Sequence, residues 1–66
     1  MNEVWVLTEV GDDREVRVRA VFATLEAARD AALDPLTVHE REGLWSSRWG
    51  ESQAERFTVH GRREAA

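Results

Sequence analysis

The chain of 66 residues contains no cysteine, which excludes disulfides and thiolate metal sites. The absence of cysteine suits a reducing compartment. No apolar stretch approaches the roughly 20 residues of a membrane-spanning helix. The opening MNEVWVLTEV also lacks the basic segment and apolar run of a signal peptide. We therefore expect a cytoplasmic protein that does not cross a membrane.

The chain has fewer basic than acidic residues. Nine basic and thirteen acidic residues give a net charge of −4. A general nucleic-acid binder usually carries the opposite sign, because its affinity comes largely from neutralising phosphates. Nucleic acid is therefore not the partner that the sequence favours. A fainter alternative would bind it through Arg14, Arg17, Arg19 and the pair Arg62-Arg63.

Motifs that carry catalysis or hold metals are also missing. The four glycines are scattered and form no phosphate loop. Ser46 and Ser47 lack the G-x-S-x-G context of a hydrolase nucleophile. His39 and His60 are the only histidines, and two imidazoles do not make a zinc site. The sequence predicts a protein that is not an enzyme, with no catalytic residues, no metal and no cofactor.

The chain length allows one small domain. We expect that domain to span residues 1–61, followed by a flexible tail over residues 62–66. A chain of this size buries roughly 60% of the surface that its unfolded form exposes. The domain should therefore be marginally stable unless a partner adds burial.

A hairpin is predicted in the first half, where residues 3–10 and 15–22 alternate in character around a turn at residues 11–13. The register that pairs Val10 with Val16 also sets Glu9 opposite Arg17, which favours it over registers that oppose like charges. In this register the even-numbered residues share one face. We expect Val6, Val18 and Phe22 on that face to contact the helix. The members of the even face are Val4, Val6, Val10, Val16, Val18, Ala20 and Phe22.

Helical spacing follows over residues 24–32, with Thr24 as the N-cap and Asp34-Pro35 ending the helix. Further strands are predicted at residues 36–41, 44–49 and 55–60, with a turn at Glu42-Gly43 and a polar connection over residues 50–54. In the last of these strands, Phe57 and Val59 are expected to face inward. The sequence thus predicts a single α+β domain with the order β-β-α-β-β-β. Its mostly antiparallel sheet of four to five strands would carry one helix on one face.

A candidate interface lies on the other hairpin face, where Trp5, Leu7 and Val21 gather. If a single helix covers the sheet, this cluster is open, and Arg17 and Arg19 would form a charged rim around it. Two alternatives remain: the C-terminal strands fold over the cluster, or Trp5 stacks on Arg19. We expect a homodimer formed through this face, with a further protein partner of unknown identity.

Trp45 and Trp49 form a second candidate site. The two-residue turn places both indoles on the face of Leu36 and Val38, which favours packing in the core or at its rim. The alternative is a small-ligand or nucleotide pocket at a subunit interface, built from Trp45, Arg48 and Trp49.

The first half resembles a family of small uncharacterised phage and prophage proteins. Those proteins open with V-[WY]-V-[VL]-T and carry V-F-[AS]-[ST]-x-E-x-A at a strand-to-helix junction. This chain has Val4-Trp5-Val6-Leu7-Thr8 and Val21-Phe22-Ala23-Thr24-x-Glu26-Ala27-Ala28 at those places. The resemblance covers residues 3–33 and implies a phage-encoded accessory protein. Such a protein would act as a small interaction module that binds a host or phage macromolecule without catalysis.

Overall fold

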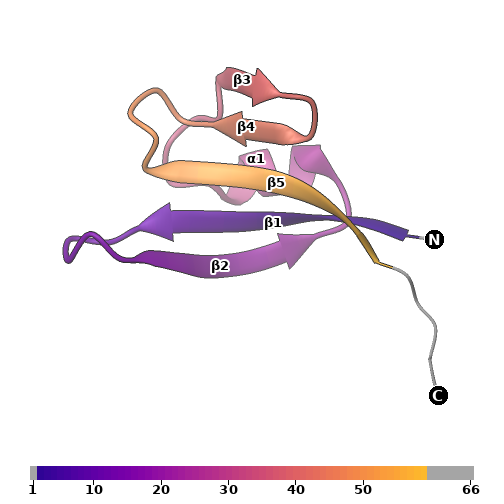
Figure 1. Cartoon of the computed structure of the whole chain (residues 1–66), viewed down its shortest axis with the longest axis horizontal. Coiled ribbons are helices and arrows are strands. Elements are labelled where there is room, and N and C mark those ends of the chain that lie inside the picture. Colours follow the sequence, from indigo (N-terminus) through magenta and orange to yellow (C-terminus); the bar gives the residue numbers. More distant parts are fainter. Residues whose placement is uncertain (1, 60–66) are drawn as a thin grey trace, which may run out of the picture.

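Five antiparallel strands form one sheet in the computed structural model, which describes residues 2–59 (Figure 1). The strands lie in the order β2-β1-β5-β4-β3, so the last strand along the chain is the central one. A single helix, α1, follows the first hairpin. The predicted α+β domain and its element order are confirmed, whereas His60 and the tail over residues 62–66 lie outside the described residues. The elements are β1 (Asn2–Val10), β2 (Val16–Phe22), α1 (Leu25–Ala31), β3 (Val38–Arg41), β4 (Leu44–Ser46) and β5 (Ser52–Val59).

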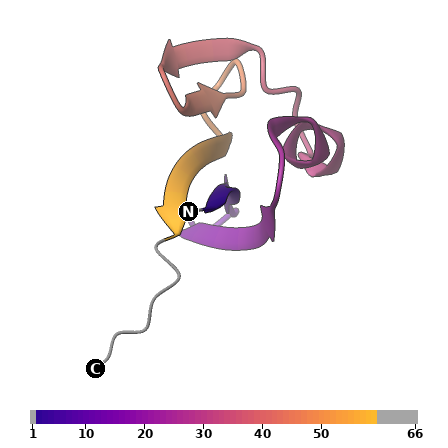
Figure 2. The same cartoon turned by 90° about the vertical axis from the view of Figure 1, so that its right-hand side faces the viewer.

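The helix covers one face of a curved sheet (Figure 2). It contacts β1, β2 and β5. The Thr24 hydroxyl accepts a hydrogen bond from the Ala27 amide at 3.1 Å, as expected for an N-cap. Glu26 lies in the first turn, where the positive end of the helix dipole favours an acid. The helix ends at Ala31, a little before the predicted stop.

The core lies between this helix and the sheet. Four hydrophobic residues are fully or almost fully buried: Leu7, Ala28, Leu36 and Ala54. Larger side chains surround them and are partly buried: Trp5, Phe22, Leu25 and Trp45, together with Ala31 and Ala32. Because the alanines of α1 are short, the helix approaches the sheet closely and the strands supply most of the apolar volume.

A β-bulge divides the hairpin into two parts. Near the turn, Val10 pairs with Val16 and Glu9 with Arg17, as predicted. Beyond the bulge, Leu7 pairs with Ala20, and Arg19 is the extra residue of β2. An extra residue reverses the side-chain alternation of the strand that carries it. Ala20 and Phe22 therefore share a sheet face with Leu7 and Trp5, and not with Val6 and Val4 as predicted.

This reversal corrects the predicted core. Phe22 pairs with Trp5 and packs against the core, so its predicted contact with the helix side is confirmed. The prediction that Val6 and Val18 face the helix is wrong, because Val18 is 65% exposed while Leu7 is completely buried. The alternation V-W-V-L makes both faces apolar, and the helix covers the face with the bulkier side chains.

The second half differs from the prediction at its strand ends. The Glu42-Gly43 turn and the pair Arg41–Leu44 are confirmed, with Gly43 at a φ of 82°. Leu36 is not in a strand but is a buried core residue. The sheet also continues through residues 52–54, which were predicted to be a connection and instead pair with β1 and β4.

The predicted inward face of the last strand is wrong. Phe57 and Val59 are 48% and 44% exposed. Phe57 pairs with Val4, so it shares the sheet face that α1 leaves uncovered. Ala54, on the other face of β5, is the core residue.

Candidate interaction surface

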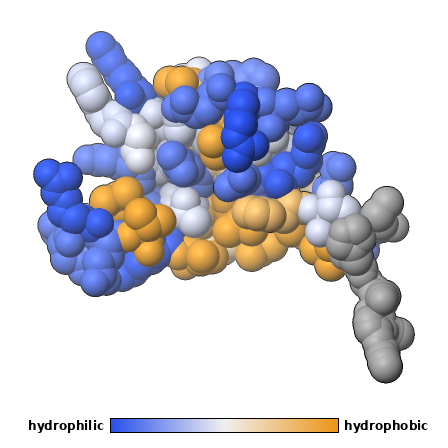
Figure 3. All heavy atoms as spheres, in the orientation of Figure 1, coloured by the Kyte–Doolittle hydropathy of each residue, from blue (hydrophilic) through white to orange (hydrophobic). Residues whose placement is uncertain are grey.

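The side of β2, β1 and β5 that faces away from α1 is an apolar surface, here called the valine face. The pairs Val6–Val21, Val10–Val16 and Val4–Phe57 place apolar residues of all three strands on it, since directly opposed residues share a sheet face. Glu55 and Gln53 of β5 lie on the same face, opposite Val6 and Thr8. Figure 3 shows hydrophobic residues gathered over this part of the sheet, with hydrophilic residues over β3 and β4. Its members are Val4, Val6, Val10, Val16, Val18, Val21, Phe57 and Val59.

Exposure shows how much of this surface is accessible. Val16, Val18 and Val21 are 67%, 65% and 55% exposed. Val4, Val6 and Val10 are more covered, because they lie on β1 between neighbouring strands. Single exposed valines are ordinary, but a continuous apolar patch spanning several strands is typical of a binding surface.

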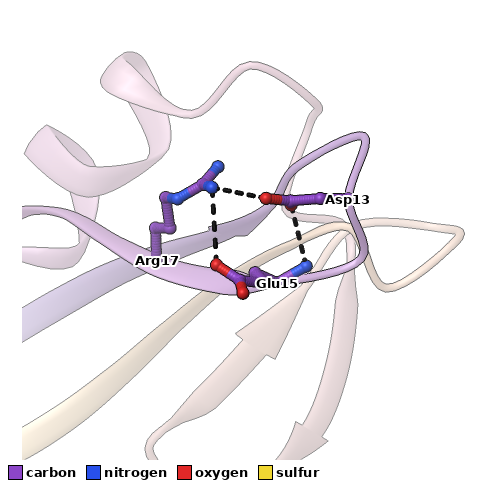
Figure 4. A network of polar contacts seen from close by, with 3 residues as sticks. All are labelled: Asp13, Glu15 and Arg17. Atoms are coloured by element: carbon purple, nitrogen blue, oxygen red, sulfur yellow. Dashed lines mark hydrogen bonds and ion pairs between the residues drawn. The ribbon is translucent and has the colours of Figure 1, made fainter.

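Charged residues of the hairpin lie on the helix side instead. Arg17 pairs with Asp13 at 2.6 Å and with Glu15 at 3.5 Å across the end of the hairpin (Figure 4). Arg19 pairs with Glu9 at 3.2 Å. Arg17 and Arg19 thus lie on the side of Trp5 and Leu7, as predicted, but the prediction that this cluster is open is wrong, because Leu7 is buried in the core and Trp5 packs against it.

Glu9 is the acid that ties the hairpin to the rest of the fold. Its side chain is only 14% exposed. Besides the ion pair with Arg19, its Oε2 accepts hydrogen bonds from the Leu33 amide at 3.1 Å and the Ser52 hydroxyl at 3.5 Å. The carboxylate thus joins β1, the end of the helix and the start of β5.

The predicted Trp5-Leu7-Val21 cluster is split between the two sides of the sheet. Leu7 is in the core, and Trp5 packs beside it with the Arg56 guanidinium 5.9 Å from its ring centroid. Arg56, and not Arg19, is therefore the cation nearest this indole among the described contacts. Val21 alone lies on the open face, because the bulge moved it there. Side-chain size was the sequence signal that could have found the covered face, since Trp and Leu alternate with valines.

Trp45 belongs to the core region. Its ring stacks on His39 with centroids 4.5 Å apart and planes 13° apart. The Arg29 guanidinium of α1 lies 4.3 Å from the ring centroid. A bulge in β3 sets Trp45 opposite His39 and not on the face of Val38, so the predicted face is wrong. The core-packing reading fits this environment.

Trp49 lies elsewhere, in the loop between β4 and β5, and is 78% exposed. The Arg48 guanidinium is 5.0 Å from its ring centroid. Both side chains line a hollow of ≈ 340 Å³, here called the Trp49 hollow. Trp45 does not line it, so the structure does not bring the predicted trio together. The remaining lining residues are Asp34, Pro35, Thr37 and Ser47.

Hydrogen bonds fix the loop that presents Trp49. The Ser47 hydroxyl is buried and accepts from the amides of Glu51 and Ser52 at 3.1 Å and 3.0 Å. The Gly50 amide donates to the Ser47 carbonyl at 2.9 Å, with Gly50 at a φ of 76°. Glu51 in turn accepts from the Val10 amide at 2.9 Å. The loop is therefore held in one conformation with an indole exposed at its tip.

The polar side chains offer little for catalysis. Ser46 is buried and donates to Glu40 Oε2 at 2.6 Å, a pair with no histidine in contact among the described interactions. Among residues 2–59, no three His, Asp or Glu side chains group in a way that could hold a metal ion.

Comparison with family models, with curated proteins and with solved structures finds no match to this chain. The one helix in the described part of the chain is too short and too polar to cross a membrane.

Proposed function

We propose that this protein is a non-catalytic interaction module that binds a protein partner through its valine face. The observation that carries the proposal is the apolar surface that β2, β1 and the end of β5 form on the side of the sheet without a helix. Apolar centres free of charge are typical of the buried middle of protein interfaces. A phage-encoded accessory role in the host cytoplasm, as the sequence resemblance implies, belongs to the same proposal.

The distribution of charge supports this choice of surface. Within β1 and β2, Glu9, Arg17 and Arg19 form ion pairs on the helix side. Glu3, the other charged residue of these strands, lies on the same side of β1 as Glu9, since side chains alternate along a strand. On the open side of the sheet, Glu55 of β5 lies opposite Val6, and its carboxylate is paired with Arg41 of β3 at 2.8 Å. A partner can therefore cover the valine face without stripping water from an unpaired charge, which would be costly.

Capture of partners with matched variants tests the proposal. Val18→Arg introduces a charge at the middle of the valine face, and Leu33→Arg introduces the same charge at a 69% exposed leucine beyond the helix. Both variants should keep the wild-type circular dichroism. We expect proteins retained from a bacterial lysate by wild type and Leu33→Arg to be lost with Val18→Arg. If Val18→Arg retains the same lysate proteins as wild type and self-associates to the same extent, the valine face is not the binding surface.

A second candidate function is ligand binding at the Trp49 hollow, favoured by the exposed indole beside Arg48. A volume of ≈ 340 Å³ is at the lower end of small-molecule pockets, which begin at roughly 300 Å³. Native mass spectrometry of the purified protein would detect a retained small molecule, and Trp49→Ala should release it without loss of structure. Retention that survives Trp49→Ala would place the ligand elsewhere.

Nucleic-acid binding through the arginines finds less support. Arg17 and Arg19 are engaged by acids of the hairpin, so they offer little net positive charge to phosphates. Arg62 and Arg63 lie outside the described residues.

A further inference from the structure

We infer that the occupant of the valine face is a second copy of this chain, packed sheet face against sheet face across a two-fold axis. This inference rests on the proposed function, because it names the partner of the same surface. It replaces the dimer expected through Trp5 and Leu7, whose side chains the helix covers. The resulting assembly is a sandwich of two sheets with one helix on each outer side.

The shape of the valine face fits another sheet better than a helix or a peptide. Among the hollows described for residues 2–59, one of ≈ 100 Å³ lies at the turn end of the valine face, where Thr8, Val10 and Val16 line it. None of the described hollows lies between Val6, Val18 and Val21 in the middle of that face. A surface without a groove does not match an inserted helix or an extended peptide. Twisted sheets instead pack on one another about 10 Å apart, with side chains of the two inner faces interdigitating.

The composition of the valine face allows it to contact a copy of itself. A two-fold axis brings the same patch of each copy together, so the patch must be complementary to itself. Charged patches fail this condition because like charges meet. The β1-β2 part of the valine face satisfies it, since these two strands present only valine, Thr8 and Asn2 on this side among the described residues. On β5 the same face also carries Gln53 and Glu55, and the Glu55 carboxylate is paired with Arg41 at 2.8 Å.

Area sets the expected strength. With 7 residues in β2, strand rise and strand spacing give the three-stranded part of this face a footprint of roughly 300 Å² per copy. Stable complexes bury about 800 Å² on each partner, and weak or transient ones bury less. We therefore expect a reversible dimer with a dissociation constant in the micromolar range, not an obligate one.

The salt dependence of association distinguishes a second copy from a partner of opposite charge. Each copy carries a net charge of −4, so two copies repel each other at a distance. Added salt screens this repulsion, and the dimer should hold or strengthen as the salt concentration rises. A partner of opposite charge would show the reverse dependence.

Sedimentation velocity of the purified chain tests the inference. Wild type should pass from monomer to dimer as its concentration rises through the micromolar range, and more salt should not weaken the dimer. Val18→Arg should raise the dissociation constant at least tenfold, while Leu33→Arg leaves it within about twofold. The two variants change the net charge equally, so a difference between them reports on the face and not on the charge.

A measurement without substitution guards against a folding defect in Val18→Arg. On dilution of isotope-labelled wild type, the methyl resonances of Val16, Val18 and Val21 should shift together, while those of Leu33 stay in place. A wild type that remains monomeric at millimolar concentration, or a dimer whose dilution leaves these three valines unmoved, overturns the inference. If the chain is monomeric but a foreign protein is still captured through Val18, the proposed function survives and only the second copy is refuted.

Discussion

At the scale of single residues, Leu7 and Val18 show how differently two apolar positions of one hairpin contribute. Leu7 is completely buried in the core, whereas Val18 is 65% exposed. We expect Leu7→Ala to lose about 2–5 kcal/mol of unfolding free energy, which would unfold much of so small a domain. Val18→Ala should stay within about 0.5 kcal/mol of wild type in the monomer. Urea denaturation at low protein concentration measures both, and equal losses would contradict the assignment of the two faces.

Ser47 is the residue on which the exposed indole depends. Replacing it with alanine leaves the Glu51 and Ser52 amides without their acceptor, at a cost of about 1–3 kcal/mol for groups that are buried. We expect Ser47→Ala to speed hydrogen exchange at these two amides far more than at the Leu7 amide. The Trp49 fluorescence spectrum should change with the loop. Unchanged exchange at Glu51 and Ser52 would show that the hydroxyl does not hold the loop.

At the scale of elements, the bulge decides which side chains each face receives. Because Arg19 is the extra residue, its deletion joins the pairs Thr8–Val18 and Leu7–Ala20 into one regular ladder. Every other side chain keeps its face. We expect the deletion to lose only the Glu9 ion pair, which at an exposed arginine is worth less than about 1 kcal/mol.

Deletion of Val21 is the matched control. It also gives a regular ladder, but one in which Arg19 replaces Ala20 opposite the buried Leu7. That variant should melt well below the Arg19 deletion in thermal denaturation followed by circular dichroism. If the two deletion variants have the same melting temperature, the bulge does not determine which side chains of β2 lie on each face.

The sequence predicted the features that depend on a few adjacent residues. The hairpin turn, the Thr24 cap and the Glu42-Gly43 turn were predictable, because each depends on a few adjacent residues. The faces were harder to predict, since valines alternate with Trp5 and Leu7 and leave both sides apolar, so that only the larger size of Trp5 and Leu7 distinguishes the covered side. The bulge at Arg19 has no glycine or other local marker to announce it.

Pairing between strands that are distant in the sequence was also not predictable. The polar residues 52–54 were predicted to be a connection, because nothing in GESQA indicates a strand. Their strand character comes from β1 and β4, which pair with them on both sides. Of the candidate site, only Val21 was placed correctly by the sequence, and Val16, Val18 and Phe57 were assigned to the wrong side.

At the scale of the whole molecule, the small core couples stability to association. Only four hydrophobic residues of the described chain are buried. Anything that binds the folded state alone raises its apparent stability by mass action. We expect the melting temperature of wild type to rise with protein concentration and that of Val18→Arg to stay constant. Differential scanning calorimetry over a hundredfold concentration range checks this, and a constant wild-type value would argue against coupling.

The central position of β5 has a consequence for synthesis. The strand that joins the β2-β1 hairpin to the β4-β3 hairpin is the last of the five to leave the ribosome. Until residues 52–59 emerge, the two hairpins have no shared strand, and Leu7 lacks the Ala54 partner against which it pairs. A purified chain truncated after residue 51 should therefore be sensitive to protease along its whole length, whereas a chain that includes residues 52–59 should be protected. The sheet is complete only after residues 52–59 have been made, and until then both apolar faces of the first hairpin are open to chaperones.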